Sequence, residues 1–587
     1  MVVLGINISH DSSISIVKDG QHLFSIAEER INRIKVYTGF PFKSLRYIID
    51  NQIIQPEEIT DISISSSFFS KKWAFTYAFE LTEDRLYYDV LNESKPKNFY
   101  INDSDYLSIR DKRSCKAYVG TKLKNIFETF NISAKIHYVD HHFAHACAAY
   151  YASGFKKALS ITMDGVGDRL SSTVNICENG TVTKVSETDG KNSVGLLYSE
   201  VTKMCGFKVA RHEGKITGLA AHGDFSAYED CFDKLLKYKD GKILHNDPIT
   251  NKVKRVILSI LNGKKIGRSR SLLSLCGKLS DKDLAASIQN LVEKVIKRNI
   301  EYWINETKIY NVVLGGGVFA NVKVNQHVSE IANLKELFIF PNMGDGGNAY
   351  GSAAFVYFSN NKHIPLKTKN VYLGPEFSNQ YIKKMLDRHK DKVEFYLSND
   401  ICKDTAQLLS SNKIIGWFQG RMEYGPRALG NRSIIASPVD SSINQWLNER
   451  MERTEFMPFA PSCLYEFADE LFEITNEKLK YPAEFMTITF NMKEKWTEMA
   501  PAVSHIDKTA RPQLVTKEAN PKYHNLLRHY YELTGLPLFI NTSFNVHEEP
   551  IVCLPEEGLK SLLSGVIDYF CIGDFICHLK SSNAKKE

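Results

Sequence analysis

The stretch KALSITMDGVGDRLSSTVNICENGTVTKVS, residues 157–186, contains two turns between three segments that look like β-strands. An apolar segment leads into an acidic, glycine-bearing turn, and an alternating segment then reaches an Asn-Gly pair and a third strand. Asn-Gly between alternating segments is a strong signal for a tight β-hairpin. The same order occurs at residues 2–29, where Asp19 and Gly20 form the second turn. We therefore predict a β-hairpin unit that occurs twice.

A predicted helix and a glycine cluster follow the second hairpin unit. Residues 281–303 keep helical spacing in their apolar side chains, which are Leu284, Ile288, Leu291, Val292 and Val295. The chain then reads NVVLGGGVFANVKVN, a strand followed by Gly315, Gly316 and Gly317. Two hairpins followed by strand, glycines and helix resemble the actin/hexokinase/Hsp70-like ATPase fold, in which such glycines let backbone amides cradle phosphate. The alternative for the glycines is an ordinary tight turn.

The length and composition are those of an ordinary globular protein. The 587 residues suffice for two large domains or three to four smaller ones, with 43% hydrophobic and 24% charged residues. A net charge of +6 is mild for this length, so composition does not indicate nucleic acid binding. We find no signal peptide and no run of about 18 apolar residues that would cross a membrane. Eleven cysteines without a CxxC pair predict free thiols in a reducing cytoplasm.

Three histidines begin a predicted apolar helix in YVDHHFAHACAAYYASGF, residues 138–155. Residues four apart stack on one helix face, so His141 and His145 point the same way, and His142 is turned about 100° from them. Asp140 suits the N-cap. Two imidazoles at this spacing can bind one metal ion, and the alternative is a set of core or capping histidines.

Two aspartates could complete a metal site. Asp164 closes a strand in ITMDGVGD, and Asp345 follows a strand in FPNMGDGGNAYGSA. Turns at strand ends bring carboxylates to one edge of a sheet, where a helix-borne histidine pair could meet them. Two imidazoles and two carboxylates suit iron, manganese or zinc. The alternative for each aspartate is helix capping.

The second half of the chain is rich in arginine and glycine. After a linker-like segment near residue 366, the block QGRMEYGPRALGNRS at 419–433 places three arginines among glycines and a proline. Arginine binds phosphate or carboxylate through two hydrogen bonds, and glycine permits close approach of an anion. We therefore predict domains at 1–365 and 366–587, with an anionic ligand in the second. Surface salt bridges are the alternative. The predicted anion-binding residues are Arg421, Arg427, Arg432, Arg453, Arg511, Asn541, Ser543 and Asn545.

Several motifs together resemble the NodU/CmcH-type O-carbamoyltransferase family. They are GINISHDSSISIV, DHHFAH, MDGVGD, EGKITGLAAHG, LGGGVFANVKVN and GDGGNAYGSA. The amino-terminal part is also similar to the tRNA threonylcarbamoyladenosine transferase subunit, which shares the fold and an HxxxH metal pair. The resemblance implies a metal, with iron(II) expected, on His141, His145, Asp164 and Asp345.

The same resemblance implies further roles in the first domain. His10 would be the catalytic base, and Lys35 would line the same cleft. An imidazole beside Asp11 in a tight turn can take a proton near neutral pH, and the alternative is a turn histidine held by Asp11. Gly315 to Gly317 with Asn321 would hold an adenylate.

The second half resembles the YrdC-like α/β domain that this family fuses to its first domain. The block QGRMEYGPRALGNRS carries the likeness. Some members have REPFRPFAPS where this chain has RTEFMPFAPS, so Met457 replaces an arginine and leaves Arg453 as the residue carried over. In the family, this domain joins carbamoyl phosphate and ATP, with Mg, into carbamoyladenylate, and releases phosphate and pyrophosphate.

The implied second step transfers the carbamoyl group to a hydroxyl of a small-molecule acceptor at the metal site. The mild net charge and the missing apolar run predict no nucleic acid and no membrane as partner, and homodimer formation stays open. The alternatives are tRNA threonylcarbamoyladenosine synthesis, hydrogenase maturation and a non-catalytic nucleotide sensor. No basic stripe supports the first, and the absence of CxxC motifs disfavours the second. The acceptor is not predicted, although the aromatic segment at 65–105 would lie near its cleft.

Overall fold

The computed structural model describes residues 1–67, 112–246, 279–361, 366–452, 458–546 and 548–580. The chain packs into two compact units. The first contains Met1–Glu28, Val36–Ala320 and Met343–Leu366, and the second contains Glu29–Lys35, Asn321–Asn342 and Lys367–Glu587. Two short segments of the predicted first domain thus pack with the second unit. The predicted domain boundary between residues 365 and 366 stays a prediction. The two units group residues by how they pack, and this grouping does not test a domain boundary.

The first unit opens with a mixed five-stranded sheet of order β3-β2-β1-β4-β5. β1 pairs antiparallel with β2, β2 pairs antiparallel with β3, and β4 and β5 add in parallel. Asp19 and Gly20 at the β2–β3 turn have φ values of 50° and 80°. The strands are β1 Val2–Asn7, β2 Ser13–Lys18, β3 Gln21–Ala27, β4 Asp61–Ile64 and β5 Lys135–Tyr138.

In a second sheet, β11, β6, β7 and β8 are neighbours in that order and repeat this connectivity. β6, β7 and β8 form an antiparallel meander, and β11 pairs in parallel with β6, as β4 does with β1. Asn179 and Gly180 at the β7–β8 turn have φ values of 50° and 80°, the same as the turn in the first sheet. The predicted duplicated hairpin unit is therefore confirmed. The strands are β6 Lys157–Gly167, β7 Leu170–Glu178, β8 Thr181–Asp189 and β11 Asn311–Gly315.

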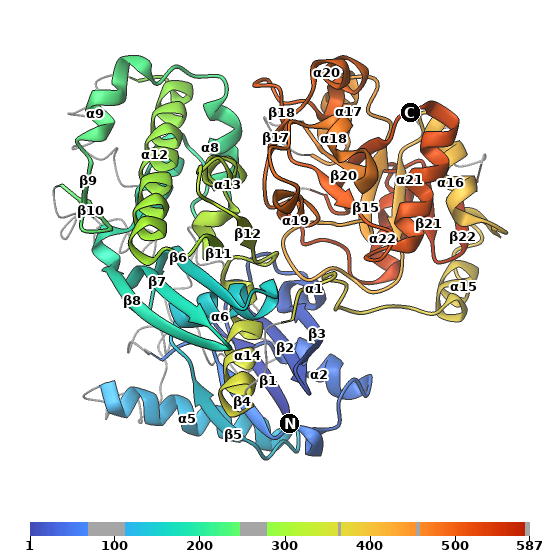
Figure 1. Cartoon of the computed structure of the whole chain (residues 1–587). Helices are drawn as coiled ribbons and strands as arrows, with labels where there is room; N and C mark the ends of the chain where they lie inside the picture. The colour runs from blue at the N-terminus through green and yellow to red at the C-terminus, as the bar shows by residue number, and fades with distance from the viewer. Residues whose placement is uncertain (68–111, 247–278, 362–365, 453–457, 547, 581–587) are drawn as a thin grey trace. The chain divides into compact units, whose positions relative to one another are not determined.

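Two small-residue helices connect the sheets of the first unit. α14 (Asn348–Asn360) packs on β1, β2 and β4, while α6 (His141–Ser153) packs on β6 and β11. The two helices also pack on each other, because both contain alanines and Gly351 of α14 lies against Ala144 and Ala148 of α6. They lie together in Figure 1. This layering brings the start of α6 and the start of α14 to the same place.

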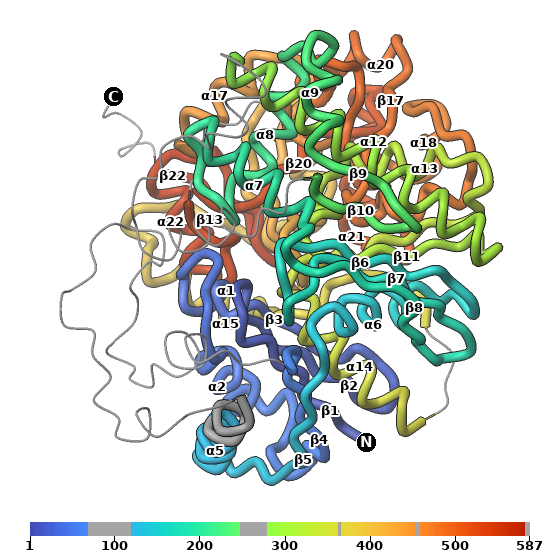
Figure 2. Tube along the Cα trace, turned by 90° about the vertical axis from the view of Figure 1, so that its left-hand side faces the viewer, coloured from blue at the N-terminus to red at the C-terminus, as the bar shows by residue number. Residues whose placement is uncertain are grey.

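The remaining described helices of the first unit cover its outer faces. α12 packs against α7, α8 and α9, and α5 lies beside β4 and β5 in Figure 2 as well as in Figure 1. α12 contains the helix predicted at 281–303. The bounds are α2 Phe42–Asp50, α5 Lys112–Thr129, α7 Val194–Met204, α8 Glu213–Ala220, α9 Glu229–Asp233 and α12 Asp281–Thr307. A hairpin of β9 Leu236–Lys239 and β10 Lys242–His245 lies beside α9.

The second unit is built on an eight-stranded sheet of order β13-β22-β21-β14-β15-β20-β16-β19. Its central strands β14 (Ile415–Phe418) and β15 (Arg432–Ala436) are antiparallel, and the loop at 419–431 joins them. The other strands are β13 Val393–Leu397, β16 Ala460–Leu464, β19 Gln513–Val515, β20 Leu538–Ser543, β21 Tyr569–Ile572 and β22 Phe575–Leu579.

Helices complete the second unit and make the whole chain mixed α/β, as predicted. α16 and α21 pack on each other, and α22 packs on β14 and β21. The longer helices are α13 Val322–Ser329, α15 Asn379–Asp387, α16 Ile401–Ser410, α17 Ser442–Arg450, α21 Pro521–Thr534 and α22 Pro555–Leu563. No described helix has both the length and the apolar character needed to cross a membrane. Nine cysteines of the described part are free, and seven of these are buried.

Candidate metal centre

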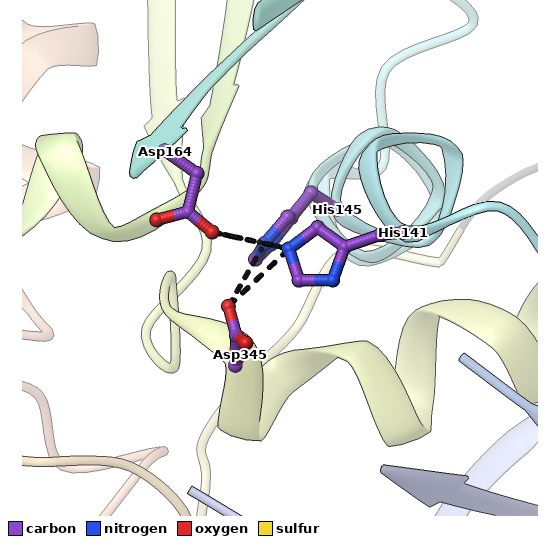
Figure 3. Close-up of side chains that lie close together, drawn as sticks. All are labelled: His141, His145, Asp164 and Asp345. Carbon is purple, nitrogen blue, oxygen red and sulfur yellow. Dashed lines mark hydrogen bonds and ion pairs between the residues drawn. The ribbon is translucent and has the colours of Figure 1, made fainter. Parts of the chain in front are cut away.

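α6 places two histidines side by side at its first two turns. The Asp140 side chain accepts a hydrogen bond from the backbone N–H of Phe143 and caps the helix, as predicted. His141 and His145 lie one helical turn apart on the same face, and their Nε2 atoms are 3.2 Å apart (Figure 3). Both rings are buried. Two imidazole nitrogens that face each other away from solvent repel unless a proton or a cation lies between them.

Asp164 reaches the histidines from an irregular part of β6. The pairing of β6 with β7 shifts register between Met163 and Gly167, so the segment that contains Asp164 departs from the regular ladder. The N–H of Gly165 donates to Asp164 Oδ1 at 2.7 Å and fixes the carboxylate. Its other oxygen, Oδ2, lies 3.1 Å from His141 Nε2 and 3.4 Å from His145 Nε2.

Asp345 faces the same two nitrogens from the short turn before α14. Its Oδ1 lies 3.4 Å from His141 Nε2 and 3.5 Å from His145 Nε2, and the side chain is 3% exposed (Figure 3). Ser9 donates a hydrogen bond from Oγ to Oδ2 at 2.8 Å. Oδ1 is buried with no hydrogen-bond partner among the residues that the structure describes. A buried carboxylate oxygen without a donor needs a cation to offset the loss of water.

These four side chains fit a divalent transition metal. One potential ligand atom from each of His141, His145, Asp164 and Asp345 lies within 4.8 Å of the others. A cation with bonds of about 2.1 Å holds neighbouring ligand atoms roughly 3.0–3.4 Å apart, which is close to the distances given above. The donor set of two imidazoles and two carboxylates is compatible with iron, manganese or zinc, and does not select among them.

The charges of the cluster stabilise one another. Burial opposes the charged form of Asp345, but His10 and His141 hold the pKa of this carboxyl well below its usual range. Burial likewise disfavours a charged His141, but Asp345 and Asp164 raise its pKa well above the usual value. The cluster thus has a strong negative potential that favours a cation, whether a proton or a metal ion.

His142 lies outside this group, in the direction that its position on the helix predicts. The ring is fully buried, with Nδ1 at 2.8 Å from Thr162 Oγ1 and Nε2 at 3.0 Å from the Leu170 carbonyl oxygen. Burial lowers its pKa to about 3, with the neighbouring His141 and His145 acting in the same direction. His142 is therefore a neutral ring that ties α6 to β6 and β7.

His10 borders the cluster from the turn after β1. Its Nδ1 lies 3.0 Å from Asp11 Oδ2, and its Nε2 lies 3.2 Å from Asp345 Oδ2. The ring is 49% exposed, so a solute can reach it. The charge of Asp345 raises the pKa of His10 to about 10, against the effect of burial and with a further contribution from Asp11. The structure thus brings His10 to the four candidate ligands. Lys35 belongs to the segment that packs with the second unit.

The glycine cluster packs against the metal centre. Gly316 has φ of +102°, and a Cβ there would lie 2.1 Å from the carbonyl oxygen of Met163, next to Asp164. The close approach made by this glycine is therefore to the chain's own backbone. Asn321 caps α13, since its side chain accepts from the N–H groups of Lys323 and Val324. The predicted contacts of Gly315, Gly316, Gly317 and Asn321 with a nucleotide stay predictions.

Two residues near the centre were missed by the sequence analysis. Asp168 accepts a hydrogen bond from the backbone N–H of His141 at 3.0 Å and also binds Ser67. Asn348 places its Nδ2 3.2 Å from His145 Nε2. Both belong to motifs quoted above, MDGVGD and GDGGNAYGSA, so the polar residues beside each predicted ligand were the available signal.

The arginines of the loop at 419–431 make extensive contacts with the backbone. Arg432 is fully buried, and its guanidinium donates to the carbonyl oxygens of Gln419, Gly420, Asn431 and Pro375 while it stacks on Phe418. Arg421 donates to the carbonyl oxygens of Leu373 and Gly374. The contacts favour a structural role for Arg432 over the predicted contact with an anion.

The other predicted anion-binding residues are spread over the second unit. Arg427 is half-buried in the loop, and Arg511 is half-buried next to β19. Asn541 on β20 is buried and donates to the carbonyl oxygen of Ala428, while Asn545 donates to the carbonyls of Val546 and Glu549. Ser543 ends β20. Arg453, Met457 and the predicted acceptor segment beyond Ser67 lie outside the described residues.

Comparisons with known proteins identify relatives along nearly the whole chain. Residues 2–354 match the family description Carbamoyltransferase N-terminus, and residues 406–578 match Carbamoyltransferase C-terminus. The chain is 31% identical to the uncharacterized protein MJ1051 of Methanocaldococcus jannaschii, over 98% of this chain and 99% of that protein. It is 28% identical to nodulation protein NolNO of Sinorhizobium fredii, over 98% of this chain and 80% of that protein.

Solved structures give a weaker likeness. Component A of (R)-2-hydroxyglutaryl-CoA dehydratase from Acidaminococcus fermentans aligns with a TM-score of 0.31 at 16% identity, over 61% of this chain and 98% of that chain. A score this low carries no argument about fold or function. The family matches, in contrast, cover both halves of the sequence and include the four candidate metal ligands. The chain therefore belongs to the carbamoyltransferase family and is a carbamoyltransferase enzyme.

Proposed function

We propose that the chain transfers a carbamoyl group from carbamoyl phosphate to a hydroxyl of a small molecule, in two half-reactions that consume ATP. The observation that carries this proposal is the cluster of His141, His145, Asp164 and Asp345 with His10 against it, within a match to the carbamoyltransferase amino terminus. The duplicated hairpin topology supports an ATPase-like fold for the first unit, and the arginine-bearing loop supports a YrdC-like fold for the second.

The first half-reaction belongs to the second unit. Water cleaves carbamoyl phosphate to carbamate and phosphate, and a carbamate oxygen then attacks the α-phosphorus of ATP, which releases pyrophosphate and leaves carbamoyladenylate. These steps bring together several negative charges, whose repulsion the guanidinium groups of Arg427 and Arg511 would offset. Mg would accompany ATP.

The second half-reaction belongs to the metal centre. A divalent cation on His141, His145, Asp164 and Asp345 would polarise the carbamoyl carbonyl. The acceptor oxygen attacks the carbamoyl carbon, AMP leaves, and His10 takes the proton of the hydroxyl at Nε2. His10 can do this only when neutral. Once Asp345 is engaged as a ligand, its charge no longer raises the pKa of His10 to the same extent.

The test is a paired assay of His10→Ala. The variant is incubated with carbamoyl phosphate, ATP and a panel of hydroxyl acceptors (an aminoglycoside, a nucleoside, a macrocycle and an oligosaccharide). Pyrophosphate release reports the first step, and mass spectrometry of the carbamoylated product reports the second. We expect pyrophosphate release to continue while transfer falls by about 100- to 10,000-fold, the usual cost of losing a general base.

His137→Ala is the matched control, because His137 also pairs with a carboxylate in the first unit, at 2.7 Å from Asp61. This variant should keep both signals. Loss of both signals in His10→Ala alone would mean that His10 supports the fold or the first step. Transfer at the wild-type rate would mean that another group takes the proton. Failure of the wild-type protein to release pyrophosphate with carbamoyl phosphate would contradict the proposal as a whole.

A further inference from the structure

Asn348 is a fully buried amide at the metal centre. It is the first residue of α14, three positions after Asp345, and none of its surface is exposed. Its Nδ2 lies 3.2 Å from Nε2 of His145. Its Oδ1 is buried and has no hydrogen-bond partner among the residues that the structure describes. Asp345 Oδ1, three residues earlier, is likewise buried without a hydrogen-bond partner in the described part of the chain.

A single cation would account for both oxygens that have no hydrogen-bond partner among the described residues. A nitrogen of His145 that binds a cation must offer its lone pair, so an amide N–H directed at that nitrogen competes with the cation. A half turn about the Cβ–Cγ bond of Asn348 exchanges Oδ1 and Nδ2 and moves only the end of the side chain. The amide oxygen then takes the place 3.2 Å from His145 Nε2.

A separation of 3.2 Å is one at which two ligand atoms can bind the same cation. His141 Nε2 and His145 Nε2 are themselves 3.2 Å apart, and Asp164 Oδ2 is 3.1 Å from His141 Nε2. Ligand atoms on a cation with bonds of about 2.1 Å are roughly 3.0–3.4 Å apart. An amide oxygen also adds a ligand atom without adding charge. The negative charges of the two aspartates therefore still balance the charge of a divalent cation.

We propose that Asn348 is a fifth protein ligand of the metal centre, through its amide oxygen. The proposal rests on the metal site of the proposed function and extends its ligand set. It accounts for a buried amide at a position where α14 otherwise packs through small and aromatic side chains. Two imidazoles, two carboxylates and one amide oxygen would then hold the cation.

The test measures metal binding without any assay of transfer. Metal-free wild-type protein, Asn348→Ala and Asn348→Asp are titrated with Co²⁺ against a competing chelator, and the visible spectrum of each Co²⁺ complex is recorded. We expect Asn348→Ala to bind Co²⁺ about 10- to 100-fold more weakly, the range seen when a supporting group is lost. Its spectrum should change, because the number of ligands changes. Asn348→Asp keeps an oxygen in place and should bind at least as tightly as the wild type.

Asn299→Ala is the matched control. Asn299 is also a buried amide of the first unit whose Oδ1 has no described partner, but its Nδ2 donates to the carbonyl oxygen of Gly241 on a different part of the unit. Its affinity and spectrum should equal those of the wild type. The inference is overturned if folded Asn348→Ala binds Co²⁺ with wild-type affinity and spectrum. If that variant does not fold, weaker binding by Asn348→Asp overturns it instead.

The same titration separates this inference from the metal site on which it rests. His145→Ala must lose Co²⁺ if the proposed metal site is right. If His145→Ala loses Co²⁺ and Asn348→Ala does not, the four-residue site stands and the fifth ligand is wrong. If His145→Ala keeps Co²⁺ with wild-type affinity, the metal site itself is wrong, and the inference falls with it.

Discussion

At the scale of single residues, the direction in which a side chain points from α6 separates the two candidate ligands from the structural histidine. His141, His142 and His145 share one helix, one degree of burial and one side-chain chemistry. The rings of His141 and His145 meet at Nε2, whereas the two nitrogens of His142 face Thr162 and Leu170. The difference follows from the 100° step of the helix alone. A histidine that has two protein partners has no lone pair left for a metal.

Metal content therefore should distinguish His145→Ala from His142→Ala. We expect His145→Ala to lose most of its metal, because one of the two imidazole ligands is removed. His142→Ala should keep a wild-type metal content and lose about 1–3 kcal/mol of unfolding free energy, since Thr162 and Leu170 lose a buried partner. Elemental analysis and denaturant unfolding of both variants check this. A His142 variant without metal beside a metal-replete His145 variant would reverse the assignment.

His505, in the second unit, should make stability depend on pH. Burial lowers its pKa from 6.5 to about 4, and Arg511 and Lys323 act in the same direction. The unfolded chain protonates this ring near pH 6.5, but the folded chain does not do so until about pH 4. The contribution of the neutral His505 ring to the free energy of unfolding is therefore fully present above pH 6.5. It falls by about 3 kcal/mol as the pH drops toward 4.

The measurement is the free energy of unfolding at several pH values for the wild type and His505→Asn. The advantage of the wild type over the variant should shrink by about 3 kcal/mol between pH 7 and pH 4, because the variant has no imidazole to protonate. A difference that stays constant over this range would show that the folded state protonates His505 as easily as the unfolded chain does.

The cluster of His141, His145, Asp164 and Asp345 could be predicted from the sequence, because the histidine spacing and the glycines that flank the aspartates are local signals. The site around them could not be predicted in the same way. Asn348 meets His145 across 203 positions of sequence, and an amide carries no charge that would mark it as a ligand. Arg432 is a different case. The arginine and glycine pattern indicates an anion, but only tertiary burial shows that the guanidinium is held by four backbone carbonyls.

At the scale of elements, the loop at 419–431 is held by side chains beneath it. Glu423 Oε1 accepts hydrogen bonds from the N–H groups of Leu429, Asn431 and Arg432, at 2.7–3.1 Å. Trp417 donates to the carbonyl oxygen of Gly430, and Gln513 and Tyr372 both donate to that of Leu429. Because the loop is already fixed at this many points, it would lose little further conformational entropy on binding a ligand.

Removing the carboxylate of Glu423 should loosen this loop. In Glu423→Ala, three buried N–H groups lose their acceptor, so we expect the second unit to lose about 3–5 kcal/mol of unfolding free energy. Glu423→Gln keeps an amide oxygen that can accept and should lose only about 1–2 kcal/mol. Glu394→Gln, at an exposed carboxylate of the same unit, should change stability by less than about 0.5 kcal/mol. Denaturant unfolding measures all three, and wild-type stability of Glu423→Ala would show that the loop does not depend on this carboxylate.

The hairpins were predictable because their turns are local. Asp19-Gly20 and Asn179-Gly180 both need positive φ at two successive residues, and these residue pairs tolerate it. The register shift in β6 was not predictable, since it depends on the pairing with β7. We expected a turn at Asp164, whereas the strand continues to Gly167 with an irregular ladder. The position of the carboxylate at the metal centre depends on this irregularity.

At the scale of the whole molecule, the two units have different chemical characters. The first unit has a small cluster of carboxylates and imidazoles that suits a cation. The second has arginines on and around a fixed loop, which are the residues predicted to bind an anion. Each unit is compact by itself, so a substitution that removes one side chain in one unit should leave the fold of the other intact.

The two half-reactions should therefore be lost separately. Arg427→Ala removes a guanidinium that would bind a phosphate, and each lost charged hydrogen bond costs about 1.5–3 kcal/mol, or roughly 10- to 150-fold in rate. We expect this variant to release pyrophosphate slowly and to keep its metal. His145→Ala should release pyrophosphate at the wild-type rate, lose its metal and fail to transfer the carbamoyl group. Arg427→Lys keeps the charge but not the two-point contact, so its rate should fall between those of the wild type and the alanine variant.

Pyrophosphate release and metal content are measured for each protein, and carbamoylated product is measured after the variants are mixed. Arg427→Ala alone makes carbamoyladenylate only slowly, and His145→Ala alone lacks the site that uses it. If carbamoyladenylate leaves one molecule and enters another, mixing restores product because each variant supplies the step that the other lacks. If mixing restores nothing while each single loss is as expected, the intermediate passes between the half-reactions without reaching solvent. Both outcomes agree with two separate sites, and only a variant that loses metal and pyrophosphate release together would contradict the separation.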